Sequence, residues 1–411
     1  MALAALREIP LRFGRPATRT AYIAQIDGLR FLAIAVVLVW HIALRSSRYA
    51  GYWNHHGEHI ANLYGWFPHG EVGVGLFFFI SGYIIAQPFF SRPKVEWKIV
   101  DFYLRRLRRI YPPYIVAVTL CLLAVIASGY HNSRLGHENL YVSYLTSLIY
   151  MHGFVFNASS TINPPAWSLE LEMQFYVLIP FFMLLYLGSR TTPFHQRFAF
   201  GCAVIALAIV GSSLLDLAAP FDGRFRYGLL SHVYLFCAGV VVADYAQAHD
   251  PIKAAPSRAF DAVFILGLAT MFGLGLYLTR VDARPGGGWP DILAAATMLV
   301  GVVSIYFGAM RGRVGRLVMA DPWLGLIGTM CFSIYLVHIV IVEGVGSLML
   351  HRPGLHDAWA VWGVHLFVLT PAALGVSAVF YLCVERPFMT TRRVGGARAS
   401  DSRGSVEPGA L

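Results

Sequence analysis

Long apolar segments recur along nearly the whole chain of 411 residues, and they constrain its fold more than any other feature. Each spans about 18 residues or more, which is enough for a helix to cross a hydrocarbon core about 30 Å thick. The composition agrees, because 57% of the residues are hydrophobic and only 13% are charged, which is too apolar for a soluble chain. We therefore predict an all-α polytopic membrane protein of about ten transmembrane helices around a central pore, surrounded by membrane lipids.

Turn signals divide these apolar segments into ten predicted spans. They lie near residues 26–45, 72–90, 110–128, 169–188, 198–217, 228–246, 259–278, 291–310, 324–345 and 361–384. The first span follows about 25 polar and basic residues, too many for the start of a secretory signal, so we expect it to be retained. A shorter apolar run, 140–151, is predicted to lie at or dip into the outer face.

The Lys and Arg residues orient the spans. With a cytoplasmic N-terminus, ten spans place 24 of the 32 Lys and Arg residues on the cytoplasmic side, as the positive-inside rule requires. If 140–151 also crossed, 17 would lie inside and 15 outside, and the bias would vanish. Residues near 160 should then face outward and residues near 316 inward. This topology explains the net charge of +10 without a nucleic-acid partner.

Three regions are predicted along the chain. They are a basic cytoplasmic segment over residues 1–25, a transmembrane domain over 26–388 and a disordered cytoplasmic tail over 389–411. The tail is rich in Arg, Gly and Ser and has no apolar periodicity, which is the reason for expecting disorder. No soluble catalytic domain is expected at either end.

Ionisable residues inside spans indicate function, because each costs about 2.5 to 3.5 kcal/mol to insert. The first span carries Arg30 at its inner end and His41 in its outer half. About 16 Å of helix separates them, so one wall of the pore would carry a charge at the cytoplasmic mouth and a titratable base deep in the membrane. His41 is therefore a candidate base. The alternative is that its hydrogen bonds only hold two helices together.

A second group of candidates opens the predicted span 169–188. Trp167 suits the membrane interface, and Ser168 can cap the helix that follows. Glu170 and Glu172 then fall within its first turns. These acids could simply complement the helix N-terminus. Glu172 would also lie at about the depth of His41, where a carboxylate could orient the imidazole.

Arginines are concentrated just before the predicted span 110–128. On a helix, Arg105 and Arg109 stand four residues apart with Arg106 beside them, which gives a cationic face at the cytoplasmic surface. This cluster could be an anchor that only sets the orientation of the chain. Forked guanidinium groups also suit phosphate better than point charges do, so the cluster is a candidate phosphate-binding site.

Small and polar residues gather in the predicted span 72–90. They are Gly73 and Gly75 near its outer end and Ser81, Gly82 and Tyr83 in mid-membrane. Small residues usually indicate close helix packing, and here they could equally leave room for a slender pantetheine arm.

Histidines occur at two further places. His338, in the predicted span 324–345, falls in the outer half and is a candidate pore-lining residue. The loop 46–71 holds four histidines, His55, His56, His59 and His69. Because they lack the closing spacing of a metal site, we predict that they are solvated, that no metal is bound and that a chelator leaves activity undiminished.

At these residues the sequence resembles the acyltransferase 3 family, the integral-membrane O-acyltransferases that modify lipopolysaccharide, exopolysaccharide, peptidoglycan and some macrolide antibiotics. The resemblance spans about residues 24–390. Six blocks in the family's order carry it: the Arg30-to-His41 spacing, FFFISGY, RRLRR followed by IYPPY, WSLELEMQFY, SIYLVH and ERPF.

The resemblance implies roles residue by residue. His41 matches the histidine thought to be essential, and Arg30 matches the arginine ahead of it. Arg105, Arg106 and Arg109 match the arginine motif implicated in acyl-CoA use. Glu172 matches the acid of the WSL block. The family often has a small residue where this chain has Glu170, which leaves open which glutamate is the working acid.

These features predict a membrane O-acyltransferase that moves an acyl group, in the first instance acetyl, from cytoplasmic acyl-CoA. The acceptor would be a hydroxyl of an extracytoplasmic saccharide, a lipid-linked glycan or a macrolide-like small molecule. His41, oriented by Glu172, would deprotonate that hydroxyl, and a covalent acyl-His41 intermediate is an alternative. The remaining candidates for substrate binding or pore lining are Ser81, Tyr83, Trp167, Ser168 and His338.

The expected location is the bacterial cytoplasmic (inner) membrane, with both termini cytoplasmic. A transporter or flippase for a lipid-linked saccharide is the alternative function, because the same buried charges could line a substrate path. Only an enzyme would release free CoA from acetyl-CoA.

Overall fold

The computed structural model is almost entirely helical. It describes residues 9–10, 12–14, 23–53, 63–91, 93–128, 139–188, 192–219, 223–281, 287–350 and 363–389, and it contains no strand within these ranges. Among the described residues, eight helices are long and apolar enough to cross a membrane, or nine if one bent pair counts as a single span. The prediction of an all-α polytopic membrane protein is confirmed.

Seven of these spans are single helices. They are α2 (Ala24–Trp53), α3 (Gly70–Phe90), α4 (Ile99–Ala127), α7 (Trp167–Leu187), α8 (Phe194–Ala218), α11 (Arg258–Arg280) and α12 (Trp289–Arg311). The last span, Leu366–Met389, changes its helical pitch along its length. It comprises the π-helical η6 (His365–Leu369), α17 (Thr370–Phe380), the π-helical η7 (Tyr381–Glu385) and α18 (Arg386–Met389).

Two predicted spans differ from simple crossing helices. The predicted span 228–246 is α10 (Val233–His249), which has only 17 residues and is buried along most of its length. The predicted span 324–345 is divided into α14 (Pro322–Thr329) and α15 (Cys331–Leu350), which meet at an angle of 67°. The bend has a packing cause. A Cβ on Gly328 would lie 1.8 Å from the Asp27 carbonyl oxygen, so α14 presses its backbone against α2.

The apolar run 140–151 does not form a spanning helix, as predicted. Its only helix is α5 (Leu140–Leu148), and Tyr150 then adopts a left-handed conformation with φ of 58°. After α6 (His152–Phe156) the chain turns back into the bundle, where Asn163 is 1% exposed and donates a hydrogen bond to the Leu336 carbonyl at 3.0 Å. Ser160, which we expected to face outward, is 3% exposed. We call residues 157–166 the inserted loop.

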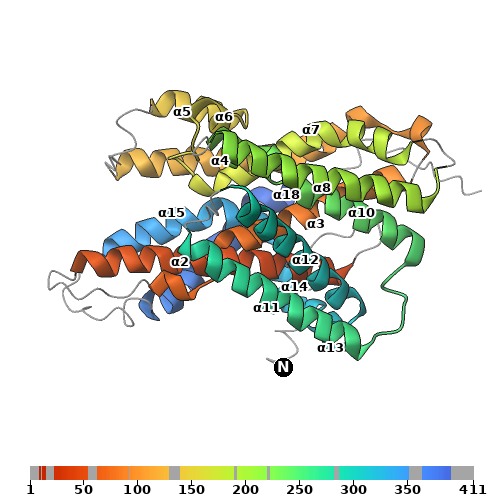
Figure 1. The fold of residues 1–411 in the computed structure, drawn as a ribbon. Coiled ribbons are helices and arrows are strands. Elements are labelled where there is room, and N and C mark those ends of the chain that lie inside the picture. The colour runs from red at the N-terminus through yellow and green to blue at the C-terminus, as the bar shows by residue number, and fades with distance from the viewer. Residues whose placement is uncertain are drawn as a thin grey trace, which may run out of the picture.

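Segments predicted to lie on one side of the membrane gather at one end of the bundle. Thr279 donates a hydrogen bond to the Phe67 carbonyl at 3.0 Å, which places the end of α11 beside the start of α3. At the opposite end, Arg197 and Asp244 form an ion pair at 2.9 Å between α8 and α10. In Figure 1 most helices run across the view, with α5 and α6 at the left and α13 (Arg313–Met319) at the lower right.

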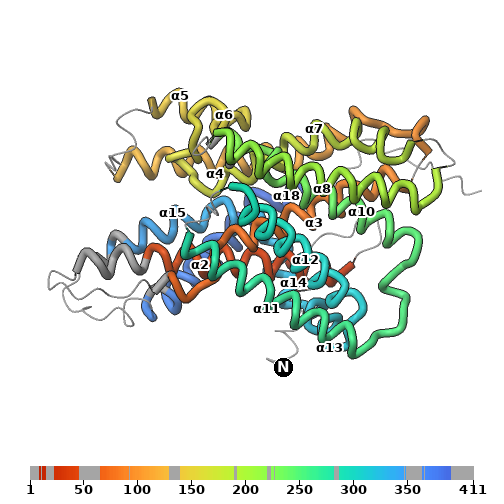
Figure 2. The backbone as a smooth tube through the Cα atoms, in the orientation of Figure 1, coloured from red at the N-terminus to blue at the C-terminus, as the bar shows by residue number. Residues whose placement is uncertain are grey.

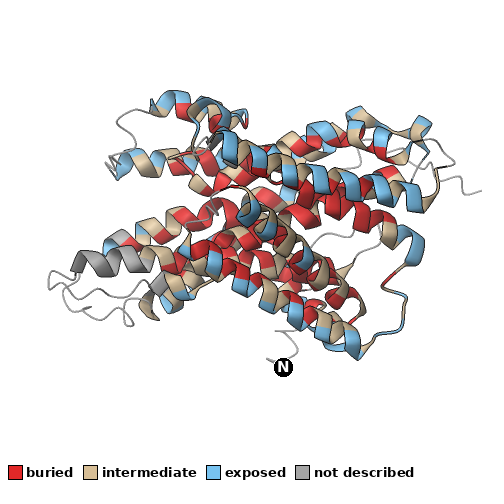
Figure 3. Ribbon diagram, in the orientation of Figure 1, coloured by how far each residue is buried: buried red, intermediate tan, exposed pale blue. Residues whose placement is uncertain are grey.

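Backbone contacts of α3 with its neighbours form the centre of the bundle. A Cβ on Gly82 would lie 2.1 Å from the Phe236 carbonyl oxygen of α10, and one on Gly73 would lie 2.5 Å from the Ala33 oxygen of α2. These glycines are therefore occupied by helix packing and do not leave room for a ligand. Figure 3 shows the buried residues along the inner faces of the helices and the exposed ones around the outside, where a membrane would surround an apolar surface.

Some predicted features lie outside the described residues. Figure 2 shows the described backbone in colour. Outside it lie His55, His56 and His59 of the histidine-rich loop, most of the basic segment 1–25 and all but the first residue of the tail 389–411. The expectations of a metal-free loop and a disordered tail therefore stay predictions.

The orientation of the bundle can be tested with two exposed residues near its opposite ends, Glu96 and Arg280. In a variant whose five native cysteines are replaced by alanine, we expect an impermeant maleimide to label Arg280→Cys in intact cells. Glu96→Cys should react only after permeabilisation, because the positive-inside rule places it in the cytoplasm. Labelling of Glu96→Cys in intact cells would contradict the predicted topology.

Candidate active site

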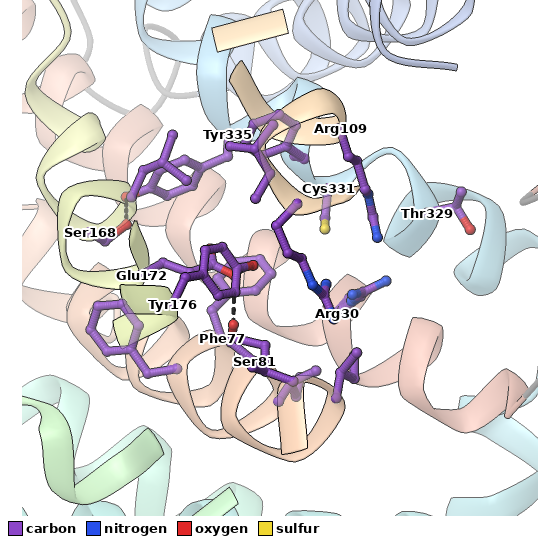
Figure 4. A pocket seen from close by; sticks show the side chains of 18 residues that line it. Arg30, Phe77, Ser81, Arg109, Ser168, Glu172, Tyr176, Thr329, Cys331 and Tyr335 are labelled. Atoms are coloured by element: carbon purple, nitrogen blue, oxygen red, sulfur yellow. Dashed lines mark hydrogen bonds between the residues drawn. The ribbon is translucent and has the colours of Figure 1, made fainter. Parts of the chain in front are cut away.

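A cavity of about 110 Å³ opens between α2, α3, α4, α7 and the break that separates α14 from α15. Its polar lining brings together residues from all of these helices, as Figure 4 shows. The polar residues that line it are Arg30, Ser81, Arg106, Arg109, Ser168, Glu172, Tyr176, Thr329, Cys331 and Tyr335. Phe77, Ile84, Ile110 and Phe332 are among the apolar residues that complete the wall.

Three arginines from two helices line the cavity. Arg30 of α2 donates to Asp27 at 3.0 Å, and the carboxylate of Asp27 is itself 1% exposed. Arg106 of α4 lies over the ring of Tyr176 with its Cζ 5.5 Å from the ring centroid. Among the described residues, neither Arg106 nor Arg109 forms a salt bridge. The cavity therefore presents guanidinium groups whose charge is available to an anionic ligand.

The arginine motif divides between two faces of α4. Arg106 and Arg109 line the cavity, whereas Arg105 and Arg108 are exposed. We expected Arg105 on the binding face. The buried residues Phe102, Ile110 and Pro113 mark the face of α4 that packs inward. Arg105 lies at the edge of this face and is exposed.

Glu172 lies in the middle of the cavity wall. Its Oε1 accepts hydrogen bonds from the Ser81 hydroxyl at 2.6 Å and from the Tyr176 hydroxyl at 2.5 Å. Tyr176 follows Glu172 by one helical turn and also stacks on Arg106. One carboxylate thus joins α3 to α7 and lies close to the arginines of α4.

Glu170 points to a different part of the molecule. It is 2% exposed, and its Oε2 accepts the Gly153 amide of α6 at 3.0 Å. The structure therefore assigns the two neighbouring acids to different places. Glu172 lines the cavity, and Glu170 ties α6 to the start of α7.

The end of the cavity that is predicted to face outward is marked by a hydrogen bond of 2.6 Å between Ser168 and Tyr335. Tyr335 also donates to the Pro165 carbonyl at 2.5 Å, so α15 holds the end of the inserted loop. Two other predicted lining residues lie elsewhere. Tyr83 packs against Tyr306, with their ring centroids 5.3 Å apart, and Trp167 packs against Tyr227 at 5.6 Å.

His41 and His338 form a pair just beyond this end of the cavity. The Nε2 of His338 lies 3.2 Å from the Nδ1 of His41, and His338 is fully buried. His338 follows Tyr335 by three residues on α15, and their ring centroids are 6.1 Å apart. Neither histidine lines the cavity itself.

The expected contact between Glu172 and His41 does not occur, because the two residues lie at different depths. The inserted loop carries the start of α7 inward to the level of Tyr335. Glu172 comes four residues after Ser168, about 6 Å further along the helix, and so falls below the histidine pair. Glu172 accepts hydrogen bonds from Ser81 and Tyr176, whereas His41 contacts the Val37 carbonyl and His338.

Sequence reasoning did not single out three polar residues that line the cavity. Tyr176 had a signal, because it stands four residues after Glu172 and shares its helix face. Thr329 and Cys331 had none, because they reach the cavity through the bend that separates α14 from α15.

Fold and site together define a class of protein, a polytopic membrane protein with a buried polar cavity that suits an anionic ligand. The family profile described as an acyltransferase domain matches residues 23–382. The chain therefore belongs to the acyltransferase 3 family and is a multi-pass membrane acyltransferase. This membership favours an enzyme over a transporter.

The curated relatives carry related names. The putative membrane-bound transacylase BcsY of Komagataeibacter xylinus is 27% identical over 375 residues, covering 88% of this chain and 81% of that protein. The peptidoglycan O-acetyltransferase OatA of Listeria monocytogenes is 23% identical over 338 residues, covering 78% and 49%. A putative O-acetyltransferase of Staphylococcus aureus strain COL is 22% identical over 344 residues, covering 79% and 52%. The chain spans about half the length of these last two. No solved structure matches it.

Exchanging each glutamate for glutamine should separate the site residue from the structural one. Glu172→Gln removes the charge beside the arginines but can still accept from Ser81, so we expect acyl transfer to fall at least about tenfold with little change in thermal unfolding. Glu170→Gln weakens a buried charge-assisted bond and should destabilise the protein by about 1–3 kcal/mol. Activity and unfolding temperature of the purified variants test this assignment, and the reverse pattern would overturn it.

Proposed function

We propose that this chain is an O-acyltransferase that uses acyl-CoA, in the first instance acetyl-CoA, as its donor. It would transfer the acyl group to a hydroxyl of a saccharide, a lipid-linked glycan or a macrolide-like acceptor on the far side of the membrane. The proposal places the protein in a bacterial cytoplasmic membrane, with both termini and the arginine end of the cavity on the cytoplasmic side.

The convergence of Arg30, Arg106 and Arg109 on one cavity is the observation that carries the donor proposal. CoA brings phosphate groups, and planar guanidinium groups bind phosphate through paired hydrogen bonds. Arginines whose only role was to set the membrane topology would not need to line a cavity. Here the two members that line the cavity form no salt bridge among the described residues, whereas Arg105 and Arg108 are exposed in the manner of anchors.

The shape of the site supports a path for the pantetheine arm. From the arginines the cavity passes Glu172 and ends at the bond between Ser168 and Tyr335, one helical turn before His338. The carboxylate of Glu172 could accept an amide N–H of the arm. The thioester would then approach His41, which lies about 16 Å beyond Arg30 along α2.

The transfer itself needs a base for the acceptor hydroxyl. His41 would remove the hydroxyl proton as the oxygen attacks the thioester carbonyl, and would return a proton to the departing CoA sulfur. An acyl group carried on His41 itself is the alternative chemistry, and trapping of radiolabelled acyl-protein after an acid quench would favour it.

A saccharide is the acceptor class that the comparisons support. The Listeria relative is named for O-acetylation of peptidoglycan, which is a glycan polymer with free hydroxyls. Purified protein supplied with radiolabelled acetyl-CoA and peptidoglycan fragments should release CoA and form labelled ester. Label transferred only to a macrolide probe would redirect the acceptor assignment without affecting the donor.

The donor site can be tested with two double variants that remove the same charge from α4. Arg106→Ala with Arg109→Ala deletes the cavity pair and should raise the apparent Kd for acetyl-CoA about 10- to 100-fold, because charge-assisted hydrogen bonds contribute about 1.5–3 kcal/mol. Arg105→Ala with Arg108→Ala deletes the exposed pair and should leave that affinity within about threefold. An equal loss of acetyl-CoA affinity in both variants would contradict the donor site and indicate that the arginines act only as a general electrostatic anchor.

The role of His41 can be tested by two substitutions that differ in hydrogen bonding. General-base catalysis typically contributes about 10²- to 10⁴-fold, so His41→Ala should lose at least that much transfer while acetyl-CoA binding is retained. His41→Gln can still hydrogen-bond a neighbouring helix but cannot take up the proton, so it should be as inactive as His41→Ala. An active His41→Gln enzyme would end the assignment of His41 as the base.

A further inference from the structure

His338 and His41 form a pair whose hydrogen bonds admit one arrangement of protons. The Nδ1 of His338 lies 3.0 Å from the carbonyl oxygens of both Ile334 and Tyr335. Carbonyl oxygens only accept hydrogen bonds, so this nitrogen carries a proton. In a neutral ring the Nε2 of His338 then carries the lone pair, and it faces the Nδ1 of His41 at 3.2 Å.

The same reasoning fixes the proton on His41. Its Nδ1 lies 2.9 Å from the Val37 carbonyl oxygen and faces the acceptor Nε2 of His338. Both neighbours accept hydrogen bonds, so Nδ1 of His41 carries the proton. The opposite assignment would direct a bare lone pair at each of these carbonyl oxygens. Nε2 is then the nitrogen of neutral His41 that can take up a proton.

We propose that His338 is the positioning residue of the enzyme, which holds His41 in the tautomer whose Nε2 is the base. Such a tautomer is usually fixed by a carboxylate or a carbonyl, and we expected Glu172 in this role. Here a second imidazole takes it, and two backbone carbonyls of α15 fix the proton of that imidazole in turn. This inference rests on the proposed function of His41.

The surroundings of the pair support a neutral His338. It is fully buried, and a proton on its Nε2 would face the proton on Nδ1 of His41. Arg45, one turn beyond His41 on α2, is held by Glu343 of α15 at 2.5 Å. The ring of Trp40 packs edge-on to His41, with centroids 4.9 Å apart, and adds no charge.

The step can then be written with its atoms balanced. The acceptor hydroxyl gives its proton to Nε2 of His41 while its oxygen bonds to the thioester carbonyl carbon. The carbon–sulfur bond breaks, the electron pair leaves with sulfur, and the proton on Nε2 passes to that sulfur to give the CoA thiol and the ester. Between these events His41 is an imidazolium ion, and its Nδ1–H donates to the lone pair of His338.

A double-mutant cycle separates positioning from a merely structural role. The variants are His338→Leu, His338→Gln, His41→Ala and His41→Ala with His338→Leu. The readouts are kcat and KM for radiolabelled acetyl-CoA with peptidoglycan fragments as the acceptor probe, together with acetyl-CoA binding. Leucine removes the acceptor atom, whereas the amide oxygen of glutamine can replace the lone pair of Nε2.

We expect His338→Leu to lower kcat at least about tenfold, towards the loss in His41→Ala, with KM for acetyl-CoA nearly unchanged. His338→Gln should recover activity to within about threefold of the wild type, clearly above His338→Leu. In the His41→Ala background, His338→Leu should cost no more than about twofold, because it acts only through His41.

Three results would overturn the proposal. The first is a wild-type kcat in His338→Leu, and the second is a His338→Gln enzyme that binds acetyl-CoA but is as inactive as His338→Leu. The third is a further large loss of activity when His338→Leu is added to His41→Ala. Failure of the proposed function is recognised separately, because His41→Ala would then keep wild-type activity whatever His338 does.

Discussion

Charged groups inside the bundle must find their partners within the protein, because lipid offers none. This constraint accounts for much of the interior. Asp27 balances Arg30, and Arg197 pairs with Asp244, which also accepts from the Tyr186 hydroxyl at 3.1 Å. Arg106 and Arg109 are the exceptions that matter, since neither forms a salt bridge among the described residues. A cavity that exposes their charge has an energetic reason to hold an anion.

Close helix packing brings the polar residues of the cavity within hydrogen-bonding distance. The backbones of α3 and α10 approach so closely that a side chain at Gly82 would collide with the Phe236 carbonyl. Ser81, the residue before Gly82, then reaches Glu172 across the α3–α7 contact. The packing that assembles the bundle therefore also brings together the polar wall of the cavity.

The sequence alone predicted the crossing helices and most of the residues of the candidate site, because long apolar runs and misplaced charges are local signals. Arg30, Arg106, Glu172 and Ser81 were all recognised in this way and share the cavity. The partner of His41 could not be found so directly, because it depends on how far the inserted loop carries α7 into the bundle. That distance is set by the contacts of Asn163 and Pro165 with α15, which no periodicity encodes.

Some features lie beyond local patterns altogether. The bend between α14 and α15 reflects the contact of Gly328 with the Asp27 carbonyl, a tertiary contact across 301 positions of the chain. The burial of α10 against α3 is likewise a tertiary feature, because it depends on a neighbouring helix that is distant in the sequence.

Because the arginine motif of α4 is divided between two faces, the helix should tolerate different substitutions at different positions of the motif. Arg105 and Arg108 are exposed, and any compact cation would satisfy the need for positive charge there, so lysine should be interchangeable with arginine at both positions. Arg106 uses the flat face of its guanidinium against Tyr176, which an ammonium group cannot reproduce. Among related chains, lysine should therefore replace arginine more often at the position of Arg105 than at the position of Arg106. Arg105 is constrained only by its charge, whereas Arg106 is also constrained by the planar shape of its guanidinium group.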